Sequence, residues 1–244
     1  MPRYLFHAAY DGTKYEGWQS QPHGNTVQDY IEKRIHQLTR EQVRIYGSGR
    51  TDTGVHARNQ PFHLDLSAPV DPDDFAHRLN RMLPQDIAIC PAGQVAQKFH
   101  ARFDANYREY CYRLTTIKDP LNHRYAYYVH HPINGQLIEQ GLDLMKGRYD
   151  FIHFCIFDEK RESTVCHLEK AEFISTGEHQ MEIRFGADRF MRKMVRYLIG
   201  SLLYLSRGKM NLAQMQHLLD GTSSGKNPAP TAPAHGLTLE KVTY

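Results

Sequence analysis

The sequence predicts an α+β protein of two domains. It contains 244 residues, of which 41% are hydrophobic and 23% charged, a composition typical of ordinary globular proteins. Strand and helix patterns alternate in both halves, but without the strict period of repeated βαβ units. At roughly 150 residues per domain, the length fits one large domain or two smaller ones. We expect two, covering residues 1–104 and 105–244.

The first half opens with a strand and an amphipathic helix. Tyr4 to Tyr10 is a run of strand formers that ends at the turn signal Asp11-Gly12. Thr26 is a candidate N-cap, and the apolar residues after it recur at three- and four-residue spacing, which predicts a helix. The elements expected next are a strand that starts at Val43 and Ile45, a Gly-rich loop over 47–56, a strand over 62–66, a helix over 73–82 and a strand over 87–90.

The second half repeats this style. A tyrosine-rich strand opens it, and an apolar strand closes it. The elements expected here are strands over 110–115, 164–175, 181–185 and 237–242, helices over 136–145 and 189–206, and a Gly/Ser/Pro/Ala-rich loop over 221–233.

The predicted helix over 189–206 carries its charge on one face. No Asp or Glu occurs from Arg189 to Lys209. A uniform cationic face without internal partners favours contact with a polyanion, or an arginine buried against a catalytic carboxylate. At about 100° per residue, Met191, Met194, Val195, Leu198 and Leu202 form one face, while Arg189, Arg192, Lys193 and Arg196 gather on the other.

Asp52 lies in the Gly-rich segment GSGRTDTGVHA, directly after a predicted strand. Glycines permit unusual backbone angles and let a bulky ligand approach the main chain. An acid on such a loop is a candidate reactive group, and a tight turn in which Asp52 caps backbone N–H groups is an equal alternative. The segment matches neither a P-loop nor a dinucleotide fingerprint.

Tyr110 and Tyr112 share one face of a predicted strand, with Arg102, Arg108 and Arg113 nearby. Paired aromatics at this spacing usually pack in a core. The functional alternative is a ring that stacks on an unpaired RNA base, because aromatic residues flanked by arginines often hold such bases.

Charge, cysteines and hydropathy limit the remaining possibilities. A formal net charge of +3 is weak support for an anionic partner. We expect neither a membrane span nor a secretion signal. We therefore expect a cytoplasmic location, with reduced thiols at the four cysteines. The spacings of His153, Cys155, Cys166 and His167 fit no common zinc pattern, so no metal site is expected.

Together the motifs resemble one family, the TruA-type tRNA pseudouridine synthases. The resemblance covers almost the whole chain in the right order. The combination of GRTD-x-GVHA with a later M-V-R-x-L-x-G helix is specific. The segments that carry it are YDGTKYEGWQ, GSGRTDTGVHA, LNRMLPQDI, KFHARFDA, REYCYR, FMRKMVRYLIGSL and HGLTLEKVTY.

The resemblance implies an enzyme that isomerises uridine to pseudouridine in the anticodon stem-loop of tRNA, at positions 38 to 40, without metal or organic cofactor. The implied fold has two related α+β domains with mixed, largely antiparallel sheets that form a continuous sheet, helices on one side, and an active-site cleft between the domains. The resemblance also implies a homodimer, with one tRNA spanning both subunits.

The same resemblance implies roles for individual residues. Asp52 is the catalytic aspartate, and Arg196 pairs with it. Tyr110 stacks against the uracil. Leu237 packs beneath the ring, a place that Leu239 can also fill. The other candidates for contact with the RNA are Arg50, which would help to hold the target nucleotide out of the stem, and the cations Arg102, Arg189, Arg192 and Lys193.

Several points stay open at this level. Asp52 can attack the sugar carbon, attack the uracil ring or remove the 2′ proton, and each route needs an ionised carboxylate. A catalytically silent tRNA- or RNA-binding protein is the alternative from another class. A metal-dependent nuclease that uses Asp52 and His56 is a third reading, which needs further carboxylates near the loop.

Overall fold

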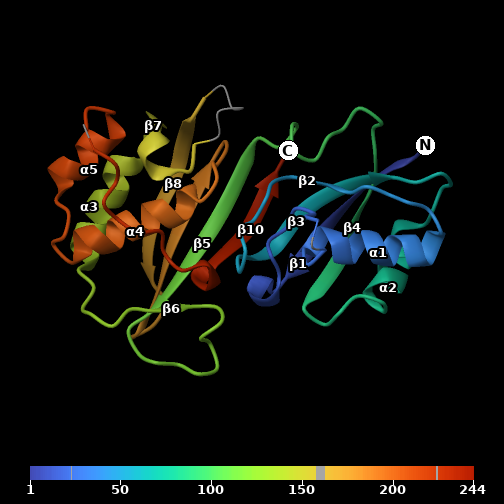
Figure 1. The fold of residues 1–244 in the computed structure, drawn as a ribbon, viewed down its shortest axis with the longest axis horizontal. Coiled ribbons are helices and arrows are strands. Elements are labelled where there is room, and N and C mark those ends of the chain that lie inside the picture. Colours follow the sequence, from blue (N-terminus) through green and yellow to red (C-terminus); the bar gives the residue numbers. More distant parts are fainter. Residues whose placement is uncertain (23, 158–162, 224) are drawn as a thin grey trace. The chain divides into compact units, whose positions relative to one another are not determined.

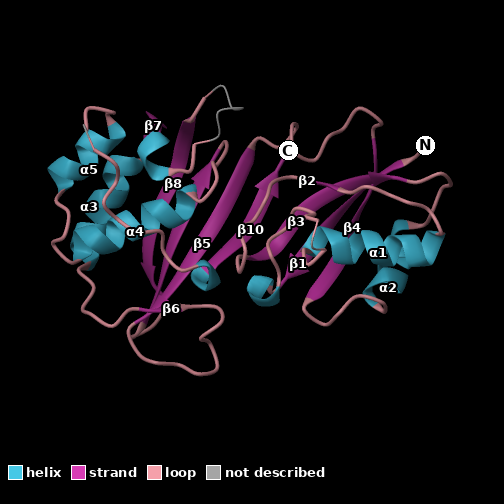
Figure 2. Cartoon of the chain, viewed as in Figure 1, coloured by secondary structure: helices cyan, strands magenta, loops and turns pink. Residues whose placement is uncertain are grey.

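A run of mostly apolar strand formers makes strand β1 (Arg3–Tyr10), the first strand in the sheet of the first of two units (Figure 1). The computed structural model describes residues 1–22, 24–157, 163–223 and 225–244. Unit 1 consists of Met1–Asn106 and Thr238–Tyr244, and unit 2 of Tyr107–Leu237. Each contains a β-sheet with α-helices against it, so the mixed α+β class is confirmed (Figure 2).

In unit 1, Tyr4, Phe6, Ala8 and Tyr10 of β1 are buried on one face of the sheet, and Leu5 is buried on the other. The strand order is β4, β1, β3, β10, and β2 also pairs with β3. Phe6, Phe62 and Trp18 pack with ring centroids 5.8 and 5.9 Å apart. The other elements are α1 (Val27–Thr39), β2 (Tyr46–Gly47), β3 (His56–Asp65), α2 (Pro72–Asn80), β4 (Ile87–Val95), β10 (Leu237–Thr243) and the 3-10 turn Gly12–Lys14.

The first helix begins where the sequence predicts. The side chain of Thr26 accepts a hydrogen bond from the N–H of Asp29, so the N-cap is confirmed. A strand is present before the Gly-rich loop, but its expected start at Val43 and Ile45 is wrong, because β2 begins only at Tyr46. Side chains take the place of a partner strand at Ile45: its N–H donates to Glu32 and its carbonyl accepts from Gln28.

Unit 2 has the strand order β5, β9, β8, β7, and β6 pairs in parallel with β5. Helix α3 packs against β8, α4 and α5. The sequence analysis did not identify β6, β7 or α5. The elements are β5 (Tyr107–Thr115), β6 (Tyr127–Tyr128), α3 (Gly135–Met145), β7 (Gly147–Asp150), β8 (Val165–Ser175), β9 (Gln180–Ala187), α4 (Met194–Ser206), α5 (Leu212–Leu219) and the 3-10 turns Ile152–Phe154 and Ala234–Gly236.

The helix expected from residue 189 is wrong in its first turn, because α4 begins at Met194. Lys193 is left-handed, with φ 61°, which no residue inside a right-handed helix adopts. The carbonyl of Arg192 accepts from the N–H of Ile156 rather than from the helix. Arg189, Arg192 and Lys193 therefore precede the helix, and the expected cationic face of one helix does not form.

The last strand also differs from expectation. Residues 105–244 were expected to form one domain, whereas Thr238–Tyr244 belongs to unit 1. The cause is pairing: Thr238 and Leu239 of β10 lie in parallel register with His56 and Ala57 of β3. The chain passes from unit 1 to unit 2 after Asn106, close to the expected join.

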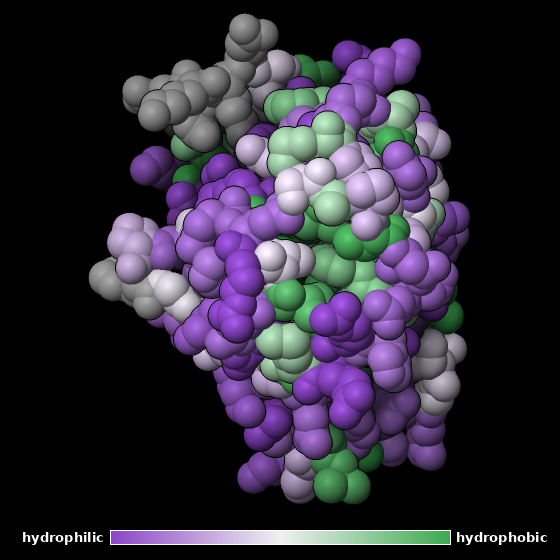
Figure 3. Space-filling model, turned by 90° about the vertical axis from the view of Figure 1, so that its right-hand side faces the viewer, coloured by the Kyte–Doolittle hydropathy of each residue, from purple (hydrophilic) through white to green (hydrophobic). Residues whose placement is uncertain are grey.

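The surface is mostly hydrophilic on the side that carries α1 and α2 (Figure 3). Hydrophobic residues appear there mainly toward the middle of the face, with hydrophilic residues on both sides.

No helix among residues 1–22, 24–157, 163–223 and 225–244 is long and apolar enough to cross a membrane. The expected loop over 221–233 is free of helix and strand where it is described, and Ser224 lies outside the described residues.

Candidate active site

Asp52 lies in unit 1, half-buried, on the loop that joins β2 to β3. Its carbonyl accepts from the N–H of Val55 at 3.1 Å, which closes a tight turn that includes Gly54 at φ 78°. The start of the loop is fixed to β3, since the side-chain amide of Gln60 donates to the carbonyl of Gly49 at 2.8 Å. The glycines of this motif therefore shape a turn that presents one carboxylate.

The segment over 11–19 packs directly behind this loop. The N–H of Trp18 donates to the carbonyl of Thr51 at 3.3 Å, and Gly54 donates to the carbonyl of Tyr15 at 3.3 Å. Gly17 has φ 89°, and a Cβ atom on it would lie 2.5 Å from the Thr51 carbonyl oxygen. No other residue type fits there without displacing the loop.

A second set of polar contacts anchors the same segment. Nδ1 of His56, a residue 3% exposed, accepts from the N–H of Gly12 at 3.0 Å. The hydroxyl of Tyr15 donates to the carboxylate of Asp86, and the N–H of Asp11 donates to the Asp86 carbonyl. Burial and the Asp86 carboxylate raise the pKa of Tyr15, so its hydroxyl stays protonated and keeps donating.

Arg50 is exposed two residues before Asp52, and its Nε donates to Oε1 of Gln19 at 3.0 Å. The segment over 11–19 therefore supports both charged residues of the loop. It bonds to the backbone next to Asp52 and to the side chain of Arg50.

In unit 2, the two tyrosines of β5 have different environments. Tyr112 is fully buried, its hydroxyl donates to the Pro233 carbonyl at 2.9 Å, and burial raises its pKa well above the ordinary value. Tyr110 is partly exposed, and its ring stands edge-on against Phe190 at 5.2 Å. Of the two, Tyr110 is therefore the one that can offer a ring face to a ligand.

Arg196 lies in the first turn of α4 and is fixed to the segment that follows α5. Its Nε donates to the Ala232 carbonyl at 2.8 Å, and its own carbonyl accepts from the Ala232 N–H at 2.9 Å. One turn later, Gly200 lets this segment approach, since a Cβ there would lie 1.9 Å from the Pro230 carbonyl oxygen.

The remaining candidates are distributed over both units. Arg189 donates to the Ser163 carbonyl at 2.5 Å, and Arg192 is exposed. Leu237 is 4% exposed at the start of β10. Arg102 lies in unit 1 with its guanidinium 5.7 Å from the centroid of the Phe103 ring. The structure thus places Asp52, Arg50 and Arg102 in unit 1, and Tyr110, Arg189, Arg192, Lys193, Arg196 and Leu237 in unit 2.

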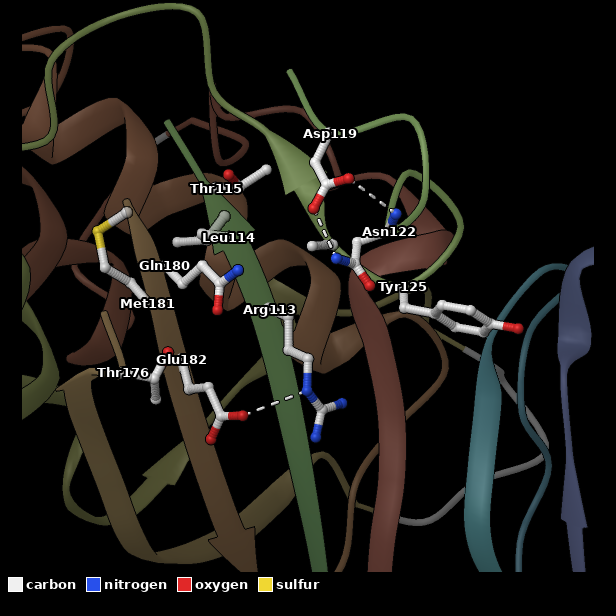
Figure 4. A pocket seen from close by; sticks show the side chains of 11 residues that line it. Arg113, Leu114, Thr115, Asp119, Asn122, Tyr125, Thr176, Gln180, Met181 and Glu182 are labelled. Atoms are coloured by element: carbon white, nitrogen blue, oxygen red, sulfur yellow. Dashed lines mark hydrogen bonds and ion pairs between the residues drawn. The ribbon is translucent and has the colours of Figure 1, made fainter. Parts of the chain in front are cut away.

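A cavity of about 250 Å³ in unit 2 contains none of these candidates (Figure 4). Arg113 and Glu182 lie opposite each other on β5 and β9, and their side chains form an ion pair at 3.2 Å. On the other side, Asp119 accepts from the amide of Asn122, which lowers the pKa of Asp119. Figure 4 shows the ion pair between Arg113 and Glu182 and the contact between Asp119 and Asn122.

The four residues considered for a metal do not form a cluster. Within the described part of the chain, no group of three or more His, Cys, Asp or Glu side chains is arranged to hold a metal ion. Burial raises the pKa of the Cys166 thiol to about 12.

Comparison with known proteins decides the family. A sequence profile described as tRNA pseudouridine synthase matches residues 7–104 and 143–244. The protein named tRNA pseudouridine synthase A of Bacteroides fragilis is 36% identical over 245 residues, covering 100% of this chain and 97% of that protein. The chain belongs to the tRNA pseudouridine synthase family. A second relative, tRNA pseudouridine synthase A 1 of Desulfotalea psychrophila, is 37% identical over 97% of each chain.

Among solved structures, the archaeal box H/ACA sRNP Nop10-Cbf5 complex is similar at a TM-score of 0.40 and 11% identity, covering 82% of this chain and 43% of that chain. The resemblance of the motifs to the tRNA pseudouridine synthase family is confirmed by the profile match. That match includes the Asp52 loop and α4, whereas Tyr110 lies between the two matched ranges.

Sequence reasoning missed the polar residues behind the loop of this pseudouridine synthase family member. Gln28 is 1% exposed and shares the buried face of α1 with Val27 and Ile31. A glutamine at a position where helical spacing requires an apolar residue was the available signal. The part played by Asp86 had no comparable signal, because its partner Tyr15 is distant in sequence.

Proposed function

We propose that this protein isomerises uridine to pseudouridine in the anticodon stem-loop of tRNA, at positions 38–40, with Asp52 as the catalytic carboxylate. The observation that carries the proposal is the single acid displayed on a glycine turn, with the segment over 11–19 packed behind it, in a chain of this family. A loop fixed from behind can hold its carboxylate in place while the substrate binds in front.

The reaction breaks the bond between C1′ of the ribose and N1 of uracil and forms a bond from C1′ to C5. The proton on C5 leaves to solvent, and N1 gains one. Atoms and electrons balance, so the isomerisation needs neither oxidant nor reductant. In this proposal Asp52 is ionised when the substrate binds. It then attacks the sugar, attacks the ring or removes the 2′ proton, and each route uses the negative charge and restores it when the product forms.

The proposal gives the other residues supporting roles. Arg196 supplies the counter-charge that favours an ionised Asp52 against desolvation. Tyr110 stacks on the uracil, and Leu237 packs beneath the ring. Because the target base must leave the stem, which costs a few kcal/mol, Arg50 helps to hold the nucleotide out. Arg102, Arg189, Arg192 and Lys193 contact the RNA backbone.

The proposed enzyme uses both units of the chain and acts as a dimer. The reaction uses residues of both units, with Asp52 from unit 1 and Arg196 from unit 2. Two copies of the chain act as a homodimer on tRNA in the cytoplasm. No metal or organic cofactor takes part.

The test measures tritium release from tRNA labelled at uracil C5, with the wild type and Asp52→Asn compared in EDTA. The labelled hydrogen leaves only when the ring is rejoined through C5. Release by the wild type alone supports the proposed reaction and the role of Asp52. Full release by Asp52→Asn removes Asp52 from the mechanism.

Two results would favour other functions. Binding of tRNA without release by the wild type would identify a catalytically silent RNA-binding protein. Strand cleavage that depends on Mg²⁺ would identify a nuclease instead.

A further inference from the structure

The buried side chain of Gln28 uses all of its hydrogen-bonding capacity. Its Oε1 accepts from Nε2 of Gln19 and from the N–H of Ser20, each at 3.0 Å. Its Nε2 donates to Oε1 of Glu32 at 2.7 Å and to the Ile45 carbonyl at 3.0 Å. An amide offers two hydrogens and two lone pairs, so no other orientation satisfies these four neighbours.

The fixed orientation of Gln28 determines that of Gln19. Because Oε1 of Gln28 faces Gln19, the Gln19 amide presents its nitrogen to Gln28 and its oxygen to the other side. That oxygen accepts from Nε of Arg50 at 3.0 Å. The bond uses one of the five N–H donors of the guanidinium and restricts rotation about the last bonds of the side chain.

The backbone around Gln19 is fastened as well. The first N–H groups of α1, from Val27 and Gln28, donate to the carbonyls of Gly17 and Trp18, each at 3.1 Å. These helix N-terminal donors have no partner within the helix, so the bonds satisfy them and fix the segment. Gln19 is therefore held by a helix on one side and faces an exposed arginine on the other.

We propose that Gln19 and Gln28 are positioning residues for Arg50, which they hold in one orientation before RNA binds. The inference rests on the proposed function, in which Arg50 holds the target nucleotide. A long exposed arginine otherwise samples many rotamers, and ordering it only when the ligand binds weakens the complex. Neither glutamine touches the substrate, and both act through the guanidinium.

A double-mutant cycle tests the coupling. Gln19→Met, Arg50→Ala and the double variant are compared by affinity for tRNA and by kcat/KM. In the otherwise wild-type protein, we expect Gln19→Met to lower the affinity for tRNA and kcat/KM roughly tenfold. In the Arg50→Ala background the same change should cost less than about twofold. Losses that multiply in the double variant would overturn the inference.

Gln28→Met enters the same cycle. It removes four hydrogen bonds in the core, so it is assayed well below its melting temperature. A loss that disappears in the Arg50→Ala background supports a positioning role. A loss that persists there shows that Gln28 serves only the fold.

Gln37→Met is the matched control. Gln37 also lies on α1, and its amide oxygen accepts from a guanidinium, that of Arg34, at 2.7 Å, but Gln37 is exposed, unlike the buried Gln28. We expect no change in affinity or in kcat/KM. A tenfold loss here would show that removing any such glutamine is harmful, and would overturn the inference.

A readout without RNA separates this inference from the proposed function. The Nε–H signal of Arg50 in the NMR spectrum of the free protein should be resolved and slow to exchange, and should broaden in Gln19→Met. An unchanged signal would refute the positioning role. If the wild type releases no tritium but the signal and the affinity cycle respond as expected, the proposed function fails and the positioning role stands.

Discussion

Gly200 of α4 faces the carbonyl oxygen of Pro230 so closely that a Cβ atom on this glycine would lie 1.9 Å from that oxygen. Four residues earlier on the same helix, Arg196 exchanges hydrogen bonds with Ala232 through both its side chain and its backbone. The segment over 230–232 thus packs closely against α4, because Gly200 has no side chain and Arg196 bonds to Ala232.

Replacing Gly200 by Ala should destabilise the protein. Inside a helix this change usually stabilises by about 1 kcal/mol, because alanine is the better helix former. Here the clash with Pro230 decides the sign, and we expect a loss of about 1–3 kcal/mol in the free energy of unfolding, measured by urea denaturation. Gly225→Ala is the control, since a Cβ there meets nothing within 4 Å. Equal stability of both variants would contradict the close approach.

Tyr110 should act through its ring rather than its hydroxyl. Tyr110→Phe keeps the edge-on contact with Phe190 and should retain most of kcat/KM. Tyr110→Ala should lower it by about 10- to 100-fold, the usual worth of stacking on a base. Tyr112→Phe, which loses the bond to Pro233, should instead lower the free energy of unfolding by about 1 kcal/mol. An equal loss in Tyr110→Phe and Tyr110→Ala would assign the role to the hydroxyl.

The cations that precede α4 should contribute to the salt dependence of tRNA binding. Arg192→Ala combined with Lys193→Gly removes two charges, and glycine accepts the left-handed backbone at residue 193. The slope of log affinity against log salt should become shallower by about 1 to 2. The check is a set of tRNA binding curves between low and physiological salt. A slope equal to that of the wild type would show that neither residue contacts phosphate.

His63 should make the stability of unit 1 depend on pH. It is 1% exposed, its Nδ1 accepts from the N–H of Ala101, and its pKa is lowered from 6.5 to about 4, mainly by burial and also by the charges of Arg3 and His100. The unfolded chain therefore takes up this proton first, so the stabilisation is complete above pH 6.5 and is lost as the pH falls toward 4. The free energy of unfolding should be about 2 kcal/mol lower at pH 4.5 than at pH 7.

His63→Asn is the companion variant, because its side-chain oxygen can accept the same N–H without titrating. The acidic groups that face His63, Asp65 and Asp104, raise its pKa and so oppose the shift. Denaturation curves at pH 4.5, 5.5 and 7 should show a smaller pH dependence for the variant. The same dependence in both proteins would exclude His63 as its source.

Local sequence patterns correctly predicted the first strand and the first helix. Strand β1 was predicted from a run of strand formers that ends at a turn signal. Helix α1 was predicted because apolar residues recur at three- and four-residue spacing after Thr26. The first turn of the helix expected from residue 189 failed for a local reason. The spacing of its charges fits a helix. However, the carbonyl of Arg192 accepts a hydrogen bond from Ile156, and Lys193 is left-handed, and residue spacing indicates neither.

The candidate site was predictable only as a set of residues. The loop motif identified Asp52, and the resemblance implied the roles of Arg50, Tyr110, Arg196 and Leu237. The supports behind the loop depend on pairs that are distant in sequence, such as Tyr15 with Asp86. Likewise, β10 was recognised as a strand, but its pairing with β3 places it in unit 1, and local pattern cannot reveal that pairing.

The parallel pairing of β10 with β3 has a consequence for synthesis on the ribosome. Thr238, which lies beside His56, emerges only after all of unit 2 has been made. Until then β3 keeps an open edge next to the Asp52 loop, ready to pair with other chains. A nascent chain that stalls within unit 2 would expose this edge, so such fragments should depend on chaperones more than the finished protein does.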